Sequence, residues 1–270
     1  MDAAALNQSP PAYPLSNEQR RFFAEEGYLV LEGAVGKEAV AELRDNVVGE
    51  YERKKKEGKL FSGGGQLSGH LNCFPGEGSR KIYEALKANG VIAASKGLFP
   101  RATGEPNVGL NLNLPKSTAQ HIHVDSVYAD DFLIINIAVV DTRIENGAIE
   151  LVPKTQQRFY RYWQYVFEGK QKDAIRVPLS QGDVLIRTSN LWHRGMPNLT
   201  EVPRPMMALT WEAGGTQHKD PFLLDEGKVT FHPNWFRPNV MGRLRERIFV
   251  AAPITYTALR IARSLVDKNY

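Results

Sequence analysis

The sequence is nearly free of cysteine. Its 270 residues include a single one, Cys73, so no internal disulfide can form, and a reducing, cytoplasmic location is expected. The composition is otherwise ordinary, since 42% hydrophobic and 24% charged residues are typical of a soluble globular protein. A chain of this length is compatible with one large β-barrel or β-sandwich domain.

Long hydrophobic runs are also absent. No apolar segment is long enough to span a bilayer, and the N-terminus lacks a basic region followed by an apolar core, so we expect no stable membrane insertion. The net charge of +4 is small, and Lys and Arg are spread along the chain. This distribution indicates no nucleic-acid surface, although it favours anionic substrates.

The glycine-rich segment 61–79 lacks the features of a phosphate-binding loop. Its Gly63-Gly64-Gly65 run follows no strand and precedes no Lys-Ser/Thr pair. We interpret the segment as a flexible loop that covers a site as a lid. His70 lies in this loop and is more typical of a surface or structural histidine than of a metal ligand.

Helical signals dominate residues 15–103. Ser16 and Gln19 form a capping box that opens a helix, and Gly27 ends it. Apolar residues recur at helical spacing over 37–56 and predict a second helix with one buried face. The first 14 residues are small and polar with three prolines, which predicts a loose tail.

From residue 104 the pattern changes to short strands. Residues 108–114 alternate strictly, which places Asn111 and Asn113 on one face and leucines on the other. Residues 132–140 form a nearly continuous apolar run, typical of a strand that is covered on both sides. Several such strands separated by turns predict a barrel or jelly roll over 104–213.

Two further segments flank this region. Residues 158–167 are rich in Arg, Tyr, Trp and Phe and predict a helix or insertion at the barrel mouth. In the C-terminal extension, 214–270, residues 240–266 predict a basic amphipathic helix broken near Pro253. Such a helix packs on the barrel, on a second subunit in a homodimer, or on an acidic membrane, as in a lipid-modifying enzyme.

The segment 120–126 carries candidate metal ligands. On a strand, alternate side chains share a face, so His123 and Asp125 would point the same way. One imidazole and one carboxylate make up two thirds of the 2-His-1-carboxylate set that binds iron with open positions. His121 would share this face, and we expect it to contact substrate or to support the ligands.

The third ligand is expected on a later strand, where His193, His218 and His232 are the candidates. His193 follows a predicted strand over 184–187. Arg204 comes soon afterwards, at the start of the next strand, and a buried guanidinium there suits a carboxylate through two parallel hydrogen bonds.

Several motifs follow one another along the chain. They are residues 22–33, His123-x-Asp125, 145–153, 182–186, His193 with Pro197-Asn198, and Arg204. Together they resemble the phytanoyl-CoA dioxygenase family of iron(II)- and 2-oxoglutarate-dependent oxygenases. The resemblance implies a mainly β fold with flanking helices, a double-stranded β-helix or cupin-like jelly roll. It also implies that Fe(II), 2-oxoglutarate and O2 are used, with release of succinate and CO2.

The resemblance also assigns residues. It implies His123, Asp125 and His193 as catalytic iron ligands and Arg204 as the partner of the distal carboxylate of 2-oxoglutarate. Asn111 and Asn113 are candidates for its other end. The family commonly has serine where this chain has Gly195, so Thr188 or Thr210 are alternatives for that hydroxyl. The candidates for substrate contact are His121, Tyr128, Trp192 and Arg194.

The reaction and substrate are less closely defined. Asp125 stands where related halogenases have a small residue, which favours hydroxylation, with desaturation, epoxidation and cyclisation as alternatives. The expected substrate is a partly apolar, anionic small molecule such as a secondary-metabolite or lipid-like intermediate. Two rivals use the same ligands: a zinc-dependent hydrolase and a non-catalytic jelly-roll binding protein.

Overall fold

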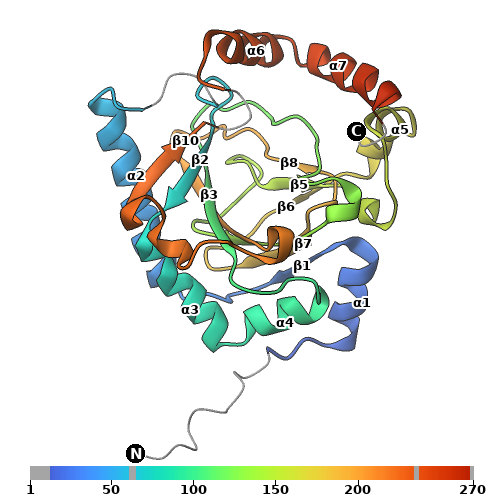
Figure 1. The fold of residues 1–270 in the computed structure, drawn as a ribbon. Coiled ribbons are helices and arrows are strands. Elements are labelled where there is room, and N and C mark those ends of the chain that lie inside the picture. The colour runs from blue at the N-terminus through green and yellow to red at the C-terminus, as the bar shows by residue number, and fades with distance from the viewer. Residues whose placement is uncertain (1–12, 61–64, 234–236, 268–270) are drawn as a thin grey trace, which may run out of the picture.

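The computed structural model describes residues 13–60, 65–233 and 237–267 (Figure 1). A seven-stranded antiparallel sheet forms the main layer, and a three-stranded antiparallel sheet faces it. The large sheet contains, in spatial order, β1 (Tyr28–Leu31), β7 (Val184–Thr188), β4 (Leu133–Ala138), β9 (Arg204–Thr210), β3 (Asn107–Asn113), β2 (His70–Pro75) and β10 (Val229–His232). The small sheet contains β6 (Ile175–Val177), β5 (Ile149–Leu151) and β8 (His193–Arg194). The predicted jelly-roll architecture with flanking helices is therefore confirmed.

Helices flank the strands on two sides. Figure 1 shows the helices that precede β3 along one side of the large sheet and the C-terminal helices on the opposite side of the molecule. Their bounds are α1 (Asn17–Glu26), α2 (Lys37–Lys56), α3 (Arg80–Ala88), α4 (Val91–Leu98), α5 (Tyr162–Phe167), α6 (Val240–Ala251) and α7 (Pro253–Val266). The predicted break near Pro253 is the boundary between α6 and α7.

The N-terminal helix begins and ends where its sequence predicts. Ser16 Oγ accepts a hydrogen bond from the backbone N–H of Gln19 at 3.1 Å, and Gln19 Oε1 accepts one from the backbone N–H of Ser16 at 2.9 Å. Gly27 closes the helix with φ 83°, a left-handed conformation that a side chain disfavours. The chain can then enter β1 directly.

The large sheet separates a hydrophobic core from the cavity between the two sheets. One face carries Leu112 of β3, Ile135 of β4 and Ile186 of β7, which pack in a single cluster with the buried side of α2. Because successive side chains of a strand alternate, the other face presents a different set. That set includes Asn136 and Arg204, which face the space between the two sheets.

The flexible loop predicted for 61–79 is wrong for its second half. Residues 70–75 form β2, which pairs with β3 on one side and β10 on the other. Leu71 and Cys73 of β2 are buried in the main core, and this burial outweighs the glycines before them. Residues 61–64 of the expected lid, and residues 1–12 of the expected tail, lie outside the described residues.

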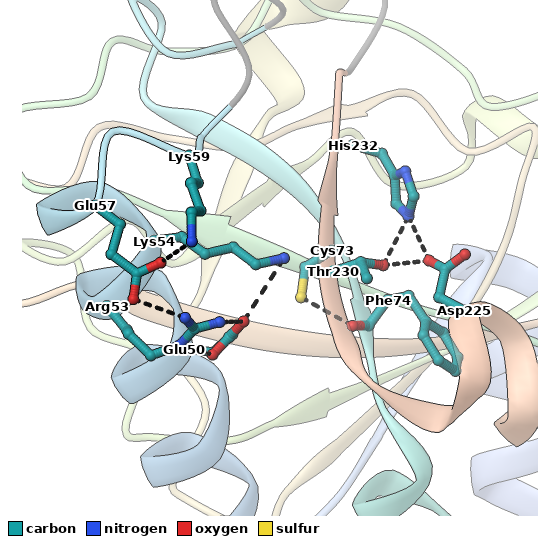
Figure 2. A network of polar contacts seen from close by, with 10 residues as sticks. All are labelled: Glu50, Arg53, Lys54, Glu57, Lys59, Cys73, Phe74, Asp225, Thr230 and His232. Carbon is teal, nitrogen blue, oxygen red and sulfur yellow. Dashed lines mark hydrogen bonds and ion pairs between the residues drawn. The ribbon is translucent and has the colours of Figure 1, made fainter.

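The basic end of α2 is a surface ion-pair network (Figure 2). Arg53 pairs with Glu50 at 2.7 Å and with Glu57, just beyond the helix end, at 2.8 Å, so its charge is balanced locally. Figure 2 also shows Asp225 together with His232 on the neighbouring β10 side. These groups lie on the surface and line no part of the cavity between the sheets.

Candidate metal centre

Three predicted ligands converge in the cavity between the sheets. His123, Asp125 and His193 each offer one ligand atom, and these atoms all lie within 4.8 Å of one another. The expected strand over 120–126 is reduced to one β-bridge, in which His123 N–H donates to His193 O at 3.0 Å and His193 N–H donates back at 2.9 Å. Asp125 N–H donates to Ser189 O at 2.8 Å. Backbone pairing with the β7–β8 region, rather than strand pleating alone, therefore brings the three side chains together.

Both imidazole rings are oriented by backbone carbonyls. The Nδ1 of His123 lies 2.7 Å from His121 O, and the Nδ1 of His193 lies 2.9 Å from Leu191 O. A carbonyl oxygen can only accept, so each Nδ1 carries the proton and each Nε2 keeps its lone pair. The Nε2 atoms lie 3.6 Å and 3.3 Å from the Asp125 carboxylate. Metal-binding histidines are usually held in this way.

Asp125 is held ionised by its surroundings. Burial opposes its charge, but the positive charge of Arg187 beside it helps to hold the pKa of this carboxyl well below its usual range. Arg187 Nη1 donates to Asp125 Oδ2 at 2.9 Å, and its Nε donates to Asn136 Oδ1 at 3.0 Å. Burial lowers the pKa of His193 to about 4, so this ring is neutral near pH 7. An ionised carboxylate and neutral imidazoles are the states that a metal ion binds.

Sequence reasoning missed Arg187. A usable signal is present, because Val184-Leu185-Ile186-Arg187 places an arginine at the end of an apolar strand. A charge in such a position is almost never buried unless it is paired. The sequence therefore indicated that Arg187 would need an anionic partner if buried, but not which residue it would be; the structure shows that it is Asp125.

A cavity of about 650 Å³ adjoins the three ligands and reaches Arg204. Arg204 is 4% exposed, and burial lowers the pKa of its guanidinium to about 10, which leaves it charged. Its Nη2 donates to Gly147 O at 3.2 Å, whereas its buried Nε has no partner among the described residues. No carboxylate in the described ranges pairs with it. An anionic ligand in the cavity would satisfy this group.

A family model described as phytanoyl-CoA dioxygenase (PhyH) matches residues 23–206. This range contains His123, Asp125, His193 and Arg204. The chain belongs to the phytanoyl-CoA dioxygenase family. The resemblance seen in its motifs is thereby confirmed.

Solved structures show the same fold at low sequence identity. The non-heme alpha ketoglutarate dependent carbocyclase SnoK from nogalamycin biosynthesis is 17% identical, with a TM-score of 0.56 over 82% of this chain and 96% of that chain. EvdO2 from Micromonospora carbonacea var. aurantiaca complexed with 2-oxoglutarate is 17% identical, with a TM-score of 0.54 over 78% and 96%. EctD from S. alaskensis with bound Fe is 15% identical, with a TM-score of 0.57 over 76% and 81%.

In this phytanoyl-CoA dioxygenase family member, only some of the remaining residues predicted to contact 2-oxoglutarate line the cavity. Asn111 lines the cavity, and Asn113 lies opposite Arg204 in the β3–β9 pair with its Nδ2 donating to Met196 O at 2.9 Å. Thr188 is on the face of β7 that carries Ile186, away from the cavity, and its buried Oγ1 has no partner among the described residues. Its hydroxyl is thus not brought to Arg204, whereas Thr210 does line the cavity.

The four predicted substrate contacts line smaller pockets beside the main cavity. His121 and Arg194 line one of about 220 Å³, while Tyr128 and Trp192 line a narrow one of about 30 Å³. His121 stacks on Tyr256 with ring centroids 3.7 Å apart. Arg194 is occupied by Glu150 at 2.6 Å, and Trp192 stacks on a tyrosine of α5 at 4.1 Å. None of the four lines the main cavity.

Two cavity residues were not predicted at all. Tyr256 and Arg260, one turn apart on α7, line the main cavity together with the metal ligands. The sequence indicated a basic amphipathic helix but not which of its residues would face a site. Within the described ranges, no helix combines the length and apolar character needed to cross a membrane.

Proposed function

We propose that the protein is a non-haem Fe(II)- and 2-oxoglutarate-dependent dioxygenase that hydroxylates a C–H bond of a small molecule. The observation that carries this proposal is one cavity that contains both a two-histidine, one-carboxylate cluster and the buried guanidinium of Arg204. SnoN, whose structure is described as a complex with Fe3+, alpha ketoglutarate and nogalamycin RO, is 18% identical over 72% of this chain, with a TM-score of 0.56. Together with the Fe and 2-oxoglutarate in the EctD and EvdO2 structures, it supports these cofactors.

His123, Asp125 and His193 would hold the iron. Backbone carbonyls fix both rings with Nε2 toward the shared space, and Arg187 keeps Asp125 ionised. Such a set leaves positions open on the metal. Bound iron with 2-oxoglutarate and O2 would supply the oxidation, with succinate and CO2 as co-products.

Arg204 would pair with the distal carboxylate of 2-oxoglutarate. Its buried, incompletely satisfied guanidinium is a fork that matches a carboxylate. Asn111 lines the same cavity and would donate a hydrogen bond to the other end of 2-oxoglutarate. Asn113 lies opposite Arg204 in the β3–β9 strand pair. The zinc-hydrolase alternative has no use for a buried cation at this place.

The substrate would be a partly apolar small molecule with an anionic group. Arg260 lines both the main cavity and the narrow pocket that Phe159, Tyr160 and Trp192 line. Its guanidinium lies 5.4 Å from the ring centroid of Tyr162, which holds the charge near the cavity mouth. Apolar rings with a fixed cation beside the metal suit a secondary-metabolite or lipid-like acid.

The decisive experiment is an anaerobic titration of the protein with Fe(II) and 2-oxoglutarate. A visible charge-transfer band would support the assignment, and zinc cannot produce one. A screen of carboxylate-bearing substrates should then release succinate and CO2, with His123→Ala as the inactive control. Binding without succinate would instead indicate a non-catalytic jelly-roll protein.

A further inference from the structure

Gly195 lies beside the cavity, two residues after His193, and the space of its missing side chain is filled by Gln120. A Cβ atom added at Gly195 would lie 2.8 Å from Gln120 Oε1 and 3.0 Å from Gln120 Cδ. It would also lie 3.0 Å from Cε1 of His70. Real Cβ atoms essentially never come closer than 3.0 Å to another heavy atom, so a side chain at 195 would require the Gln120 carboxamide to leave this position.

The backbone fixes which way this carboxamide faces. Gln120 N–H donates to Gly195 O at 2.8 Å, and Gly195 N–H donates to Gln120 Oε1 at 2.8 Å. Because the backbone N–H requires an acceptor, the oxygen must face Gly195 and the Nε2 amide must form the other end. Within the described part of the chain this Nε2 has no acceptor. Gln120 therefore offers a hydrogen-bond donor.

The Gln120 side chain lines the same cavity as Arg204, and it also lines the adjoining pocket of about 220 Å³. Gly195 lines the main cavity as well. Strand register also places His70 opposite Asn113 and Asn113 opposite Arg204, so that three strands bring these side chains to one face. The acidic residues that line the cavity are Asp125, already paired with Arg187, and Glu212, which accepts from Thr210. The Arg204 guanidinium and the Gln120 amide thus line one cavity, and neither is hydrogen-bonded or ion-paired to Asp125 or Glu212 among the described residues.

We propose that Gln120 donates through Nε2 to the distal carboxylate of 2-oxoglutarate, beside Arg204, from the space that a side chain at 195 would otherwise take. The inference rests on the proposed function, because it names a further contact of the same co-substrate. The Gln120 amide would take the place of the serine hydroxyl that the family commonly has at position 195, so the Thr188 hydroxyl is not needed for this contact.

The test measures the Kd of two 2-oxo acids on Fe(II)-loaded protein under argon, for wild type and variants. The first is 2-oxoglutarate, and the second is 2-oxopentanoate, which has the same carbon chain without the distal carboxylate. For Gln120→Ala we expect the Kd of 2-oxoglutarate to rise about 10-fold or more, as for loss of a hydrogen bond to a charged group, while that of 2-oxopentanoate stays unchanged. Gln120→Glu keeps the acceptor for Gly195 N–H but replaces the donor with an anion, and should raise the Kd of 2-oxoglutarate further.

Substitutions at both 195 and 120 give a second, independent test of the same contact. Gly195→Ser alone should weaken 2-oxoglutarate binding because its Cβ meets Gln120, whereas Gly195→Ser combined with Gln120→Ala should bind more tightly than Gln120→Ala alone. Thermal unfolding of each metal-loaded variant checks that it is folded.

Two outcomes would overturn the inference: an unchanged Kd in Gln120→Ala, or equal losses for both ligands, which would mark a purely structural role. Failure of the proposed function is distinguishable, because Arg204→Ala would then leave 2-oxoglutarate binding unaffected as well.

Discussion

Replacing Arg187 should weaken the metal site without removing any ligand. Arg187 links two groups, since its Nη1 donates to Asp125 Oδ2 at 2.9 Å and its Nε donates to Asn136 Oδ1 at 3.0 Å. Its side chain is 6% exposed, so solvent screens this pair only weakly. Arg187→Met keeps much of the volume and removes both bonds, which leaves Asp125 without its charged partner and less well oriented.

The size of the effect follows from this geometry. A hydrogen bond to a charged group contributes about 1.5–3 kcal/mol, and breaking a fully buried ion pair costs about 3–5 kcal/mol. The Asp125 side chain retains 27% exposure, so water compensates in part, and we expect the free energy of unfolding of the metal-free protein to fall by about 2–3 kcal/mol. Because the ligand loses its orienting partner, metal affinity should fall about 10–100-fold.

Two measurements check these values: urea unfolding of the chelator-treated protein, and titration with Fe(II) or Mn(II) under argon. Arg187→Lys is the matched control, because an ammonium keeps the charge but lacks the fork that reaches both partners, so its losses should be intermediate. If Arg187→Met is folded and binds metal as tightly as the wild type, the role assigned to Arg187 is refuted.

Four further changes test other parts of the structure. Arg204→Lys keeps a charge without the bidentate fork and should raise the Kd of 2-oxoglutarate about 10-fold, measured by anaerobic titration. Arg260→Gln should raise the KM of an anionic substrate about 10-fold in a succinate assay while leaving the Kd of 2-oxoglutarate unchanged. Ser16→Ala removes the cap of α1 and should lower the free energy of unfolding by about 1 kcal/mol in urea. Burial lowers the pKa of His70 to about 4, so as pH falls from 6.5 to 4 the unfolded chain binds a proton that the fold does not. The free energy of unfolding should drop by up to about 3 kcal/mol over this range, and by less in His70→Gln.

Each of these has a contrary result. A wild-type Kd for 2-oxoglutarate in Arg204→Lys would show that a positive charge alone is enough to bind it. If the charge of Arg260 binds the substrate, Arg260→Lys must have a KM close to that of the wild type. A stability unchanged by Ser16→Ala would mean that solvent replaces the cap. Equal pH slopes for wild type and His70→Gln would mean that His70 is not the group that resists protonation.

Local patterns in the sequence predicted local structure well. The capping box at Ser16 depends on residues three apart, and the buried stripe of α2 depends on residues within one helix, so each is readable without knowing the fold. The metal ligands were equally accessible, because His123 and Asp125 are two residues apart. His193 was found through its position in a family motif, not through geometry.

Features that depend on strand register were missed. Strand β2 follows a run of glycines that argues for a loop, and it forms because β3 and β10 pair with its two edges. Arg187 meets Asp125 across more than sixty positions of sequence. No local periodicity encodes which strands lie side by side, so neither the strand nor the ion pair could be derived from the sequence alone.

The predicted metal ligands and one part of the cavity wall come from different parts of the chain, and this explains why the ligands are readable from the family and that wall is not. The family match ends at residue 206, after all three metal ligands and Arg204. Tyr256 and Arg260, which face the same cavity, lie on α7 beyond that limit. The adjoining α6 is fastened to the barrel by Glu246, whose buried Oε1 accepts from the backbone N–H groups of 65, 67 and 68 at 3.0–3.1 Å. Since the chain continues from this point into β2 and His70, α6 is tied to the strand that borders the proposed co-substrate site. Helix α7 therefore forms part of the cavity wall, and under the proposed function substrate selectivity should follow the sequence of the C-terminal helices rather than that of the predicted metal ligands and Arg204.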